Sequence, residues 1–443
     1  MSQIEMINRF SEKLSDRTLS IAVVGLGYVG LPTAMAFHNV GFKVTGIDIS
    51  EQLISSLSST NEVIDEFGNI IPRGENWLVT SDYASVMPDI DIAIVCVPTP
   101  VDKSHKPNLS PVRSALDSII ESMGEGQELV IVLESTVQPG TTRQSVSKSL
   151  GGREPNEAGI MIAYCPERVS PGEGGFGVSD VGRVVGSDHT NLTLILSELY
   201  GLITSGGVMP VDSIEVAEAS KLVENAQRDI DIAFVNELSI LLPKLGLDVE
   251  KVLEAADTKW NFHRHTPGLG VGGHCIPIDP HYYIEIAERF GVKSALSPAA
   301  RELNSSMPLH NLKELEKLCD GSIPDRILIL GYSYKPNVSD SRETPVEPFV
   351  RLLIESGCKE VFIWDPVIEE PPETHGSWVE DALSLHNLDC IVVATAHDET
   401  LDLDWLELIR RTTVPRLYDS RRCLDKKKLE SMGWDFHAIG IPR

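Results

Sequence analysis

The stretch "LSIAVVGLGYVGLP", residues 19–32, decides how the first half of the chain folds. A β-branched apolar run leads into a G-x-G-x-x-G motif, and a helix-like segment follows. The motif residues are Gly25, Gly27, Tyr28, Val29 and Gly30. Glycines at this spacing allow a tight turn and a close approach of the backbone to a pyrophosphate, which would face the N-terminus of the helix. The stretch therefore predicts a dinucleotide-binding βαβ unit.

The next strand-like run, "FKVTGID", ends at Asp48. A carboxylate at this position can accept hydrogen bonds from an adenosine ribose, and it would repel the 2′-phosphate of NADP. Residues 49–60 contain no arginine that could bind such a phosphate. We therefore predict NAD as the cofactor.

Three further runs, "IDIAIVCVPTP", "ELVIVLESTV" and "IMIAYCPE", are almost continuously apolar, as in strands that are buried on both faces. Together they predict a parallel, doubly wound sheet. Ligands bind beyond the carboxyl ends of such strands. Thr99 and Thr136, which follow two of the runs, are therefore candidates to line the cofactor or the reacting centre. Either hydroxyl could instead only satisfy a turn.

From Asp212 to about Leu247 the pattern becomes helical, with no glycine before Gly246 and a break expected near Pro243. After about Ser322 the strand rhythm returns. We predict an α/β fold of two Rossmann-like, doubly wound parallel-sheet domains joined by a helical central domain with a long helix. The predicted domains are residues 1–211 (NAD-binding), 212–320 (central, dimerising) and 321–443 (a second α/β domain). The long helix is apolar on more than one side, which predicts a homodimer or a larger homo-oligomer.

The composition limits the other possible partners. Among 443 residues the formal net charge is −27, which disfavours nucleic acid and anionic lipid as general partners. No apolar run approaches the roughly 18 residues of a membrane span, and the N-terminus lacks the apolar region of a signal peptide. The seven cysteines include no C-x-x-C pair, which is typical of a reducing compartment. We expect a cytoplasmic protein.

The segment "PGLGVGGHCIPIDP", residues 267–280, places Cys275 behind a glycine-rich run. Cys275 could be a buried thiol, a zinc ligand or a nucleophile. Candidate zinc ligands near it are His263, His265, His274 and His281. Their spacing is not a standard zinc set, so we expect no metal site. A catalytic thiolate needs a nearby cation to lower its pKa, and Lys221 could supply that charge.

On the long helix Lys221, Asn225 and Arg228 are spaced to share one face. The alternative is an ordinary solvated face, on which Glu218 would pair with Lys221 and Glu224 with Arg228. The nearby glycine–cysteine segment favours a functional face.

Seven pieces of the chain, taken in order, resemble the UDP-sugar 6-dehydrogenases, a family that includes UDP-glucose and UDP-N-acetylhexosamine dehydrogenases. These pieces are "GLGYVGLP", "CVPTP", "ESTVQPGTT", "YCPERVSPG", "KLVENAQRD", "GVGGHCIPIDP" and "GYSYKPNVSDSRETP". The resemblance covers nearly the whole chain. It implies an NAD domain at residues 1–211, a central dimerising domain with the catalytic loop at 212–320 and a UDP-sugar-binding α/β domain at 321–443.

The resemblance also implies roles for individual residues. Cys275 matches the nucleophile, and Lys221 matches a cation that stabilises oxyanions or assists proton transfer. Asp279 and Thr136 match residues that hold the catalytic water, and Glu167 matches a carboxylate at the reacting end. The matched substrate contacts are Arg168, Val169, Lys221, Asn225, Arg228, Gly272 within the 268–273 loop, Tyr334, Lys335 and Arg421, with Arg422 as the alternative to Arg421. Asn225 is also a candidate catalytic residue, and Arg342 matches a cofactor contact.

The implied reaction is a four-electron oxidation of a sugar C6 alcohol to a uronate. Two hydrides pass to NAD⁺, and a cysteine holds the aldehyde as a thiohemiacetal that becomes a thioester and is hydrolysed. Such uronates are precursors of surface polysaccharides or other glycans.

The segment "TKWNFHRHTPGLG", residues 258–270, bears on which sugar is oxidised. With "GGHCIPIDP" it resembles the N-acetylhexosamine branch, and a similar T-K-W-N-F occurs in members that act on UDP-GlcNAc or UDP-GalNAc. UDP-ManNAc members tend to carry H-P-R there, whereas this chain has Asn261. Lys259 or Arg264 is the candidate to replace the missing arginine. The resemblance leaves the choice among the three N-acetylhexosamines open.

Three other functions remain as alternatives: a UDP-glucose 6-dehydrogenase, a β-hydroxyacid dehydrogenase and a non-catalytic NAD-dependent regulator. A β-hydroxyacid dehydrogenase needs neither the cysteine nor a second nucleotide domain. The presence of Cys275, Lys221 and Asp279 together argues against the regulator.

Overall fold

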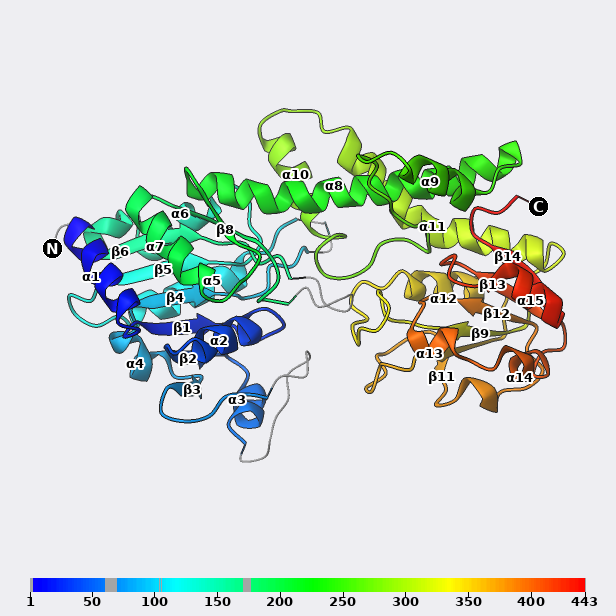
Figure 1. Cartoon of the computed structure of the whole chain (residues 1–443), viewed down its shortest axis with the longest axis horizontal. Coiled ribbons are helices and arrows are strands. Elements are labelled where there is room, and N and C mark those ends of the chain that lie inside the picture. Colours follow the sequence, from blue (N-terminus) through cyan, green and yellow to red (C-terminus); the bar gives the residue numbers. More distant parts are fainter. Residues whose placement is uncertain (1–2, 60–69, 103, 105, 170–176, 443) are drawn as a thin grey trace. The chain divides into compact units, whose positions relative to one another are not determined.

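The computed structural model describes residues 3–59, 70–102, 104, 106–169 and 177–442. The chain divides into two compact units, Met1–Glu224 and Asn225–Arg443. Figure 1 shows the helices and strands of both, labelled where there is room. None of the described helices is both long and apolar enough to cross a membrane.

The first unit is built on an eight-stranded sheet with the order β3-β2-β1-β4-β5-β6-β7-β8. Its strands are Ser20–Val24 (β1), Lys43–Ile47 (β2), Trp77–Thr80 (β3), Ile92–Val95 (β4), Leu129–Leu133 (β5), Ile160–Tyr164 (β6), Arg183–Ser187 (β7) and Val208–Val211 (β8). Its helices are Gln3–Ser15 (α1), Gly30–Asn39 (α2), Glu51–Leu57 (α3), Tyr83–Val86 (α4), Ser110–Glu121 (α5), Thr141–Ser149 (α6) and Thr190–Gly201 (α7). Strands β3 to β6 form the Rossmann order, which confirms the predicted fold. The sheet departs from the prediction at one place, because β7 runs antiparallel to β6.

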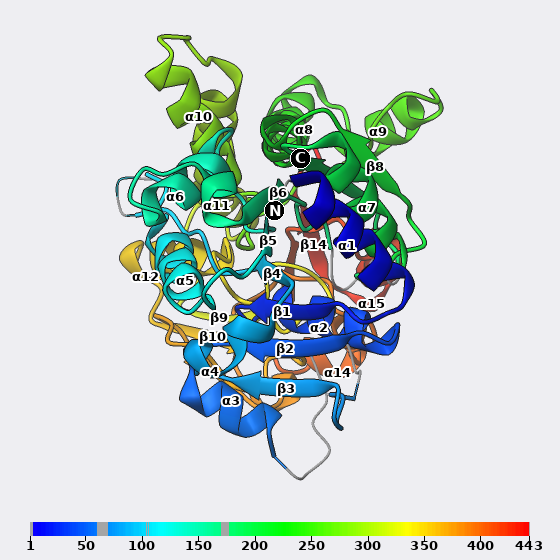
Figure 2. The ribbon, with the colours of Figure 1, turned by 90° about the vertical axis from the view of Figure 1, so that its left-hand side faces the viewer.

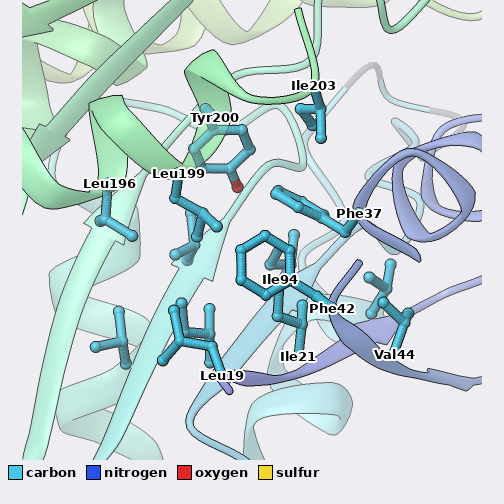
Figure 3. Close-up of a cluster of buried hydrophobic side chains, with 14 of the residues drawn as sticks. Leu19, Ile21, Phe37, Phe42, Val44, Ile94, Leu196, Leu199, Tyr200 and Ile203 are labelled. Atoms are coloured by element: carbon cyan, nitrogen blue, oxygen red, sulfur yellow. The ribbon is translucent and has the colours of Figure 1, made fainter. Parts of the chain in front are cut away.

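Strand β1 shows why the central strands read as continuous apolar runs. Successive side chains of a strand point to opposite faces. Accordingly, Ile21 and Val23 join one core, with residues of α1, α2 and α7, while Ala22 and Val24 join a second core, with residues of α5 and α6. Figure 2 shows these helices on the two sides of the sheet. Figure 3 shows the first core, where aromatic side chains from α2 and α7 point toward the strand residues.

The second unit is built on a six-stranded, all-parallel sheet with the order β11-β10-β9-β12-β13-β14. Its strands are Arg326–Leu330 (β9), Glu360–Trp364 (β10), Ser377–Trp378 (β11), Cys390–Val393 (β12), Arg416–Asp419 (β13) and Asp435–Ala438 (β14). Its helices are Val249–Asp257 (α9), Asp279–Arg289 (α10), Leu296–Leu318 (α11), Val346–Glu355 (α12), Asp398–Leu401 (α13), Trp405–Ile409 (α14) and Lys426–Met432 (α15). The strand order again follows the Rossmann pattern, as the returning strand rhythm predicted.

The long helix α8 spans Ile214–Leu241. A short 3-10 segment, Leu242–Leu245, follows it and contains Pro243. The helix therefore ends where the proline predicted a break, since proline removes a backbone donor and clashes with the preceding turn.

Candidate active site

The glycine turn after β1 has the geometry that a dinucleotide requires. Gly25 has a φ of 90°, in the left-handed region that favours glycine. A Cβ on Gly30 would lie 1.8 Å from the Gly25 carbonyl oxygen, so only glycine fits where α2 begins. A Cβ on Gly27 would meet nothing within 4 Å. Gly27 therefore leaves open space beside the helix N-terminus, where the backbone can approach a phosphate group.

Asp48 follows β2 and holds this turn. Its Oδ2 accepts a hydrogen bond from the Leu26 amide at 2.8 Å, and its Oδ1 accepts one from the Ser50 amide at 2.9 Å. The carboxylate therefore lies at the edge of the glycine turn. The turn, the helix N-terminus and this carboxylate together fit the pyrophosphate and ribose of NAD.

The loops after β4 and β5, which carry Thr99 and Thr136, lie side by side. The Ser135 hydroxyl donates to the Val97 carbonyl at 2.6 Å, and so joins the two loops. Both threonines are half-buried at the carboxyl edge of the sheet. The structure thus places both threonines beyond the carboxyl ends of their strands, and Ser135 ties their loops together.

In the first unit the structure brings Glu167 and Lys221 together. The Lys221 Nζ donates to the Glu167 carbonyl at 2.5 Å and lies 4.0 Å from its Oε2. Both residues are buried, with exposures of 7% for Lys221 and 8% for Glu167. Arg168 instead pairs with Glu224 at 2.7 Å and donates to the Gly182 carbonyl. A buried cation thus lies beside a buried carboxylate.

Glu218 and Glu224, which would pair with Lys221 and Arg228 on a solvated face of α8, bind residues of other elements. Glu218 is fully buried and accepts hydrogen bonds from the amides of Gly140 and Thr142, at 2.5 and 2.8 Å. Glu224 pairs with Arg168 rather than with Arg228, which is exposed.

In the second unit Asn225 and Asp279 form a buried pair. The Asn225 Nδ2 donates to Asp279 Oδ2 at 2.5 Å, and the Asp279 amide donates to the Cys275 carbonyl at 2.8 Å. Asp279 also begins helix α10. The nucleophile candidate is therefore one turn away from a buried carboxylate whose position a helix fixes.

The glycines before Cys275 allow close packing against the segment that follows β9. A Cβ on Gly272 would lie 2.6 Å from the Tyr334 Cβ, and one on Gly273 would lie 2.9 Å from the Tyr334 ring. The Gly273 amide donates to the Arg342 carbonyl at 3.0 Å. Burial, and then the neighbouring charges of Asp340 and Cys275, raise the pKa of Tyr334 to about 12. Tyr334, a predicted substrate contact, is thus close to Cys275.

Of three predicted arginines in the second unit, Arg342 and Arg422 are paired with carboxylates, whereas Arg421 lies beside the glycine loop. Arg342 makes a two-pronged ion pair with Asp340, at 2.6 Å for its closest contact; burial opposes ionisation of Asp340, but these bonds lower its pKa. Arg421 lies beside the loop, because a Cβ on Gly268 would be 2.8 Å from its Nη1. Arg422 is instead paired with Asp248 at 2.7 Å. Of these two alternatives, Arg421 is therefore the one that lies beside the 268–273 loop.

Lys259 and Arg264, the two candidates to replace the missing arginine, belong to the segment around residue 260. Lys259 is exposed after α9, and Trp260 has an exposed fraction of 92%. Arg264 pairs with Glu250 and lies 3.7 Å from Asp257. Among the described residues no group of three or more His, Cys, Asp or Glu side chains is arranged to hold a metal ion.

Comparison with known proteins finds similar dehydrogenases over nearly the full length of this chain. Models of the UDP-glucose/GDP-mannose dehydrogenase family match residues 19–204 (NAD binding domain), 215–306 (central domain) and 328–426 (UDP binding domain). A UDP-N-acetyl-D-glucosamine 6-dehydrogenase of Pseudomonas aeruginosa is 35% identical over 426 residues, which cover 93% of this chain and 99% of that protein. The chain belongs to the UDP-glucose/GDP-mannose dehydrogenase family.

Other members of the family are also similar to this chain over nearly its full length. A UDP-N-acetyl-D-mannosamine dehydrogenase of Methanococcus maripaludis is 33% identical, over 95% of this chain and 96% of that protein. The solved structure of a UDP-D-ManNAc dehydrogenase from Pyrococcus horikoshii has a TM-score of 0.81 at 29% identity, over 95% of this chain and 99% of that one. The chain is an NAD-dependent UDP-sugar dehydrogenase.

Sequence reasoning missed a buried ionic group beneath the cofactor loops of this dehydrogenase. Glu134 directly follows β5 and accepts hydrogen bonds from Tyr200 at 2.7 Å and from Arg183 at 3.3 Å. Burial raises the pKa of Glu134, while Arg183 and Tyr200 oppose the rise. The signal in the sequence was a glutamate at the end of the apolar run "LVIVLE", but its partners are distant in the chain.

Proposed function

We propose that this dehydrogenase oxidises the C6 alcohol of a UDP-N-acetylhexosamine (GlcNAc, GalNAc or ManNAc) to the uronate, with Cys275 as the nucleophile. The observation that carries the proposal is the position of Cys275, between a glycine loop packed on Tyr334 and the buried Asn225–Asp279 pair. The relatives at 33–35% identity named above act, by their names, on UDP-N-acetylated hexosamines. UDP-glucose is the alternative substrate.

In the proposed reaction, bound NAD⁺ supplies the hydride acceptor for both oxidation steps. The Cys275 thiolate adds to C6 of the aldehyde, and the C–S bond persists through oxidation of the thiohemiacetal to the thioester. Lys221 stabilises the negative charge that develops on the C6 oxygen. Asp279 and Thr136 hold the water that cleaves the C–S bond and restores the thiol, and Glu167 is the carboxylate at the reacting end. One alcohol, one water and two NAD⁺ thus give one carboxylate, two NADH and three protons.

The other predicted contacts are part of the same proposal. Cofactor contacts are Gly25, Gly27, Tyr28, Val29, Gly30, Asp48, Thr99, Thr136 and Arg342. Substrate contacts are Arg168, Val169, Lys221, Asn225, Arg228, Lys259, Gly272, Tyr334, Lys335 and Arg421. We place the functional domains at residues 1–211, 212–320 and 321–443, which the ranges of the three family models support.

We further propose a homodimer or a larger homo-oligomer through α8. Four large apolar residues with exposed fractions of 48–55%, namely Val216, Val223, Phe234 and Leu241, are spaced along the helix so that they form one stripe. All seven cysteines are free thiols, which supports our placing the reaction in the cytoplasm, where thiols stay reduced. The uronate would serve the synthesis of surface polysaccharides or other glycans.

The test is a substrate panel of UDP-GlcNAc, UDP-GalNAc, UDP-ManNAc and UDP-glucose, each supplied with NAD⁺, with the product identified by mass spectrometry. We expect one N-acetylated sugar to give the highest kcat/KM and to be converted to its uronate. A higher kcat/KM with UDP-glucose would contradict the N-acetylhexosamine assignment. No turnover of any UDP-sugar would favour the non-catalytic regulator.

A further inference from the structure

The loop that carries Cys275 is anchored at its first glycine by two buried asparagines. The Gly268 amide donates to Asn236 Oδ1, in α8, at 3.0 Å. The Gly268 carbonyl accepts from Asn311 Nδ2, in α11, at 3.3 Å. Both asparagines have an exposed fraction of 0%. Both backbone polar groups of Gly268 are therefore bound by side chains of the two long helices of this unit.

A chain of hydrogen bonds, buried between Asn236, Asn304 and Asp229 and partly buried at Arg301, leads from this glycine to the residue after Cys275. The Asn236 Nδ2 donates to Asn304 Oδ1 at 2.9 Å, and the Asn304 Nδ2 donates to Asp229 Oδ1 at 2.8 Å. The Arg301 Nη1 donates to the same Asp229 oxygen at 2.8 Å and reaches the Ile276 carbonyl at 3.5 Å. The chain therefore ends next to the nucleophile.

The loop also passes directly over this chain. A Cβ on Gly270 would lie 2.9 Å from the Asn304 carbonyl oxygen. Gly268, Gly270, Gly272 and Gly273 give the loop unusual backbone freedom, and so its position must be imposed by its surroundings. An asparagine amide can donate and accept at once, and this allows a continuous network without an intervening water.

The burial of these groups is not explained by stability alone. A buried ion pair is weak evidence for stability, because removing two charges from water offsets much of their attraction. Asp229 has an exposed fraction of 0%, and its burial raises its pKa, while Arg301 and Asn304 act in the opposite direction. Apolar residues would fill the space between α8 and α11 at a lower desolvation cost, but they could not bind the backbone of a loop.

We propose that Asp229, Asn236, Arg301, Asn304 and Asn311 form a positioning network that fixes both ends of the 268–276 loop and thereby the position and reactivity of Cys275. These residues act through the loop backbone. The catalytic consequence rests on the proposed function, whereas the effect on the Cys275 thiol does not.

The experiment cuts the network at its centre with Asn304→Leu and at its end with Arg301→Met. Arg301→Lys is the conservative variant, because a single nitrogen of Arg301 makes both contacts and a lysine Nζ can replace it. Glu314→Gln is the matched control: Glu314 is also in α11, pairs with Lys317 at 2.6 Å and His437 at 3.3 Å, and does not belong to the network. If Arg301→Met does not fold, Asp229→Asn/Arg301→Met removes the unpaired carboxylate as well.

Two readouts are compared with those of the wild-type enzyme. The first is the rate at which iodoacetamide alkylates Cys275, followed on its peptide by mass spectrometry. The second is kcat on the UDP-sugar together with KM for NAD⁺. We expect Asn304→Leu and Arg301→Met to change the alkylation rate at least about fivefold and to lower kcat about tenfold to a hundredfold, because small misplacements of a reacting group have effects of this size. Arg301→Lys and Glu314→Gln should stay near wild type, and KM for NAD⁺ should not change.

The network would be refuted if Asn304→Leu left both the alkylation rate and kcat unchanged. It would equally be refuted if Glu314→Gln produced the same changes, since that would indicate general loosening of the unit. If the wild-type enzyme turned over no UDP-sugar, the proposed function would fail, but the alkylation rates would still decide whether the network positions Cys275.

Discussion

At the scale of single residues, Cys275 follows a flexible glycine-rich segment, and its backbone is bound to Asp279, which a helix holds in place. The glycines before it pack against Tyr334, and its own carbonyl accepts the amide of Asp279 at the start of α10. The nucleotide part of a substrate would be bound by other residues. Loss of the thiol should therefore affect chemistry far more than binding.

Cys275→Ala should abolish uronate formation and leave the Kd for the UDP-sugar within about threefold of wild type, because the thiol contributes to bond formation rather than to binding. Cys275→Ser should accumulate a covalent ester, since an ester hydrolyses less readily than a thioester. Calorimetry measures the binding, and intact-protein mass spectrometry detects the adduct. Undiminished turnover in Cys275→Ala would show that this cysteine is not the nucleophile.

Asp48 should determine the choice of cofactor. Its carboxylate is held at the edge of the glycine turn by the Leu26 and Ser50 amides. We expect kcat/KM to favour NAD⁺ over NADP⁺ at least about tenfold, because a 2′-phosphate would be repelled there. Asp48→Asn should reduce this preference in steady-state kinetics. Equal efficiency with both cofactors in the wild-type enzyme would contradict this role.

At the scale of elements, the second sheet repeats the geometry of the first. Gly331 follows β9 with a φ of 88°, and its amide donates to the Trp364 carbonyl. Asp365, at the end of β10, accepts from the Tyr332 amide at 2.7 Å, just as Asp48 accepts from Leu26 in the first unit. In the second unit, however, Asp365 also accepts from the Ser333 hydroxyl and from the fully buried His397. Asp365 has the position of the carboxylate that binds a ribose in a dinucleotide site, but its hydrogen bonds are made to residues of this unit.

This pairing predicts a pH dependence of stability. Burial opposes ionisation of Asp365, but hydrogen bonds led by that from His397 lower its pKa from 3.8 to about 2. A carboxyl group with a lowered pKa in the folded state stabilises the fold above its unfolded pKa and loses that contribution as the pH falls toward the folded value. The shift corresponds to on the order of 2 kcal/mol.

The free energy of unfolding of wild type should therefore exceed that of Asp365→Asn at neutral pH, and the difference should shrink as the pH falls below about 4. Urea unfolding of both proteins at a series of pH values measures it. A difference that stayed constant or grew on acidification would show that this carboxylate is not stabilised in its ionised form.

The interactions within the site were much harder to predict than the elements. Glycine spacing and the apolar runs indicated the turn after β1 and the strands around it. The sequence also indicated Lys221, Asn225 and Cys275 as functional candidates, but it could not identify the partners of Glu218 and Glu224. Their actual partners come from elements distant in the chain, and local spacing carries no information on such contacts. The Asn236–Asn304 contact is of the same kind.

At the scale of the whole molecule, two Rossmann-type sheets were predictable because their central strands are buried on both faces. The long helix was predictable from the helical spacing of its residues. The strands that were missed are β3, β7, β8, β11 and β14, which are short or lie toward the sheet edges. Strand β8 contains Pro210, is only partly buried and lies at an edge, where proline is tolerated. Such strands lack the continuous apolar signal.

The stripe on α8 makes a prediction about assembly. Val223 and Phe234 each have an exposed fraction of 55%, and apolar side chains in such a row are typical of an interface. We expect sedimentation at micromolar concentration to show a dimer or a larger oligomer, and Val223→Glu/Phe234→Glu to shift it toward monomer. A wild-type monomer under these conditions would contradict the proposed interface.

The most direct test of the central claim is the number of NADH molecules formed per UDP-sugar consumed, measured together by absorbance and chromatography. A single site that retains the aldehyde on Cys275 must carry out both oxidations before release. We expect two NADH per uronate, with no free aldehyde trapped by an added hydroxylamine. A ratio of one, or an aldehyde released as the product, would contradict the account of a cysteine-held, four-electron oxidation.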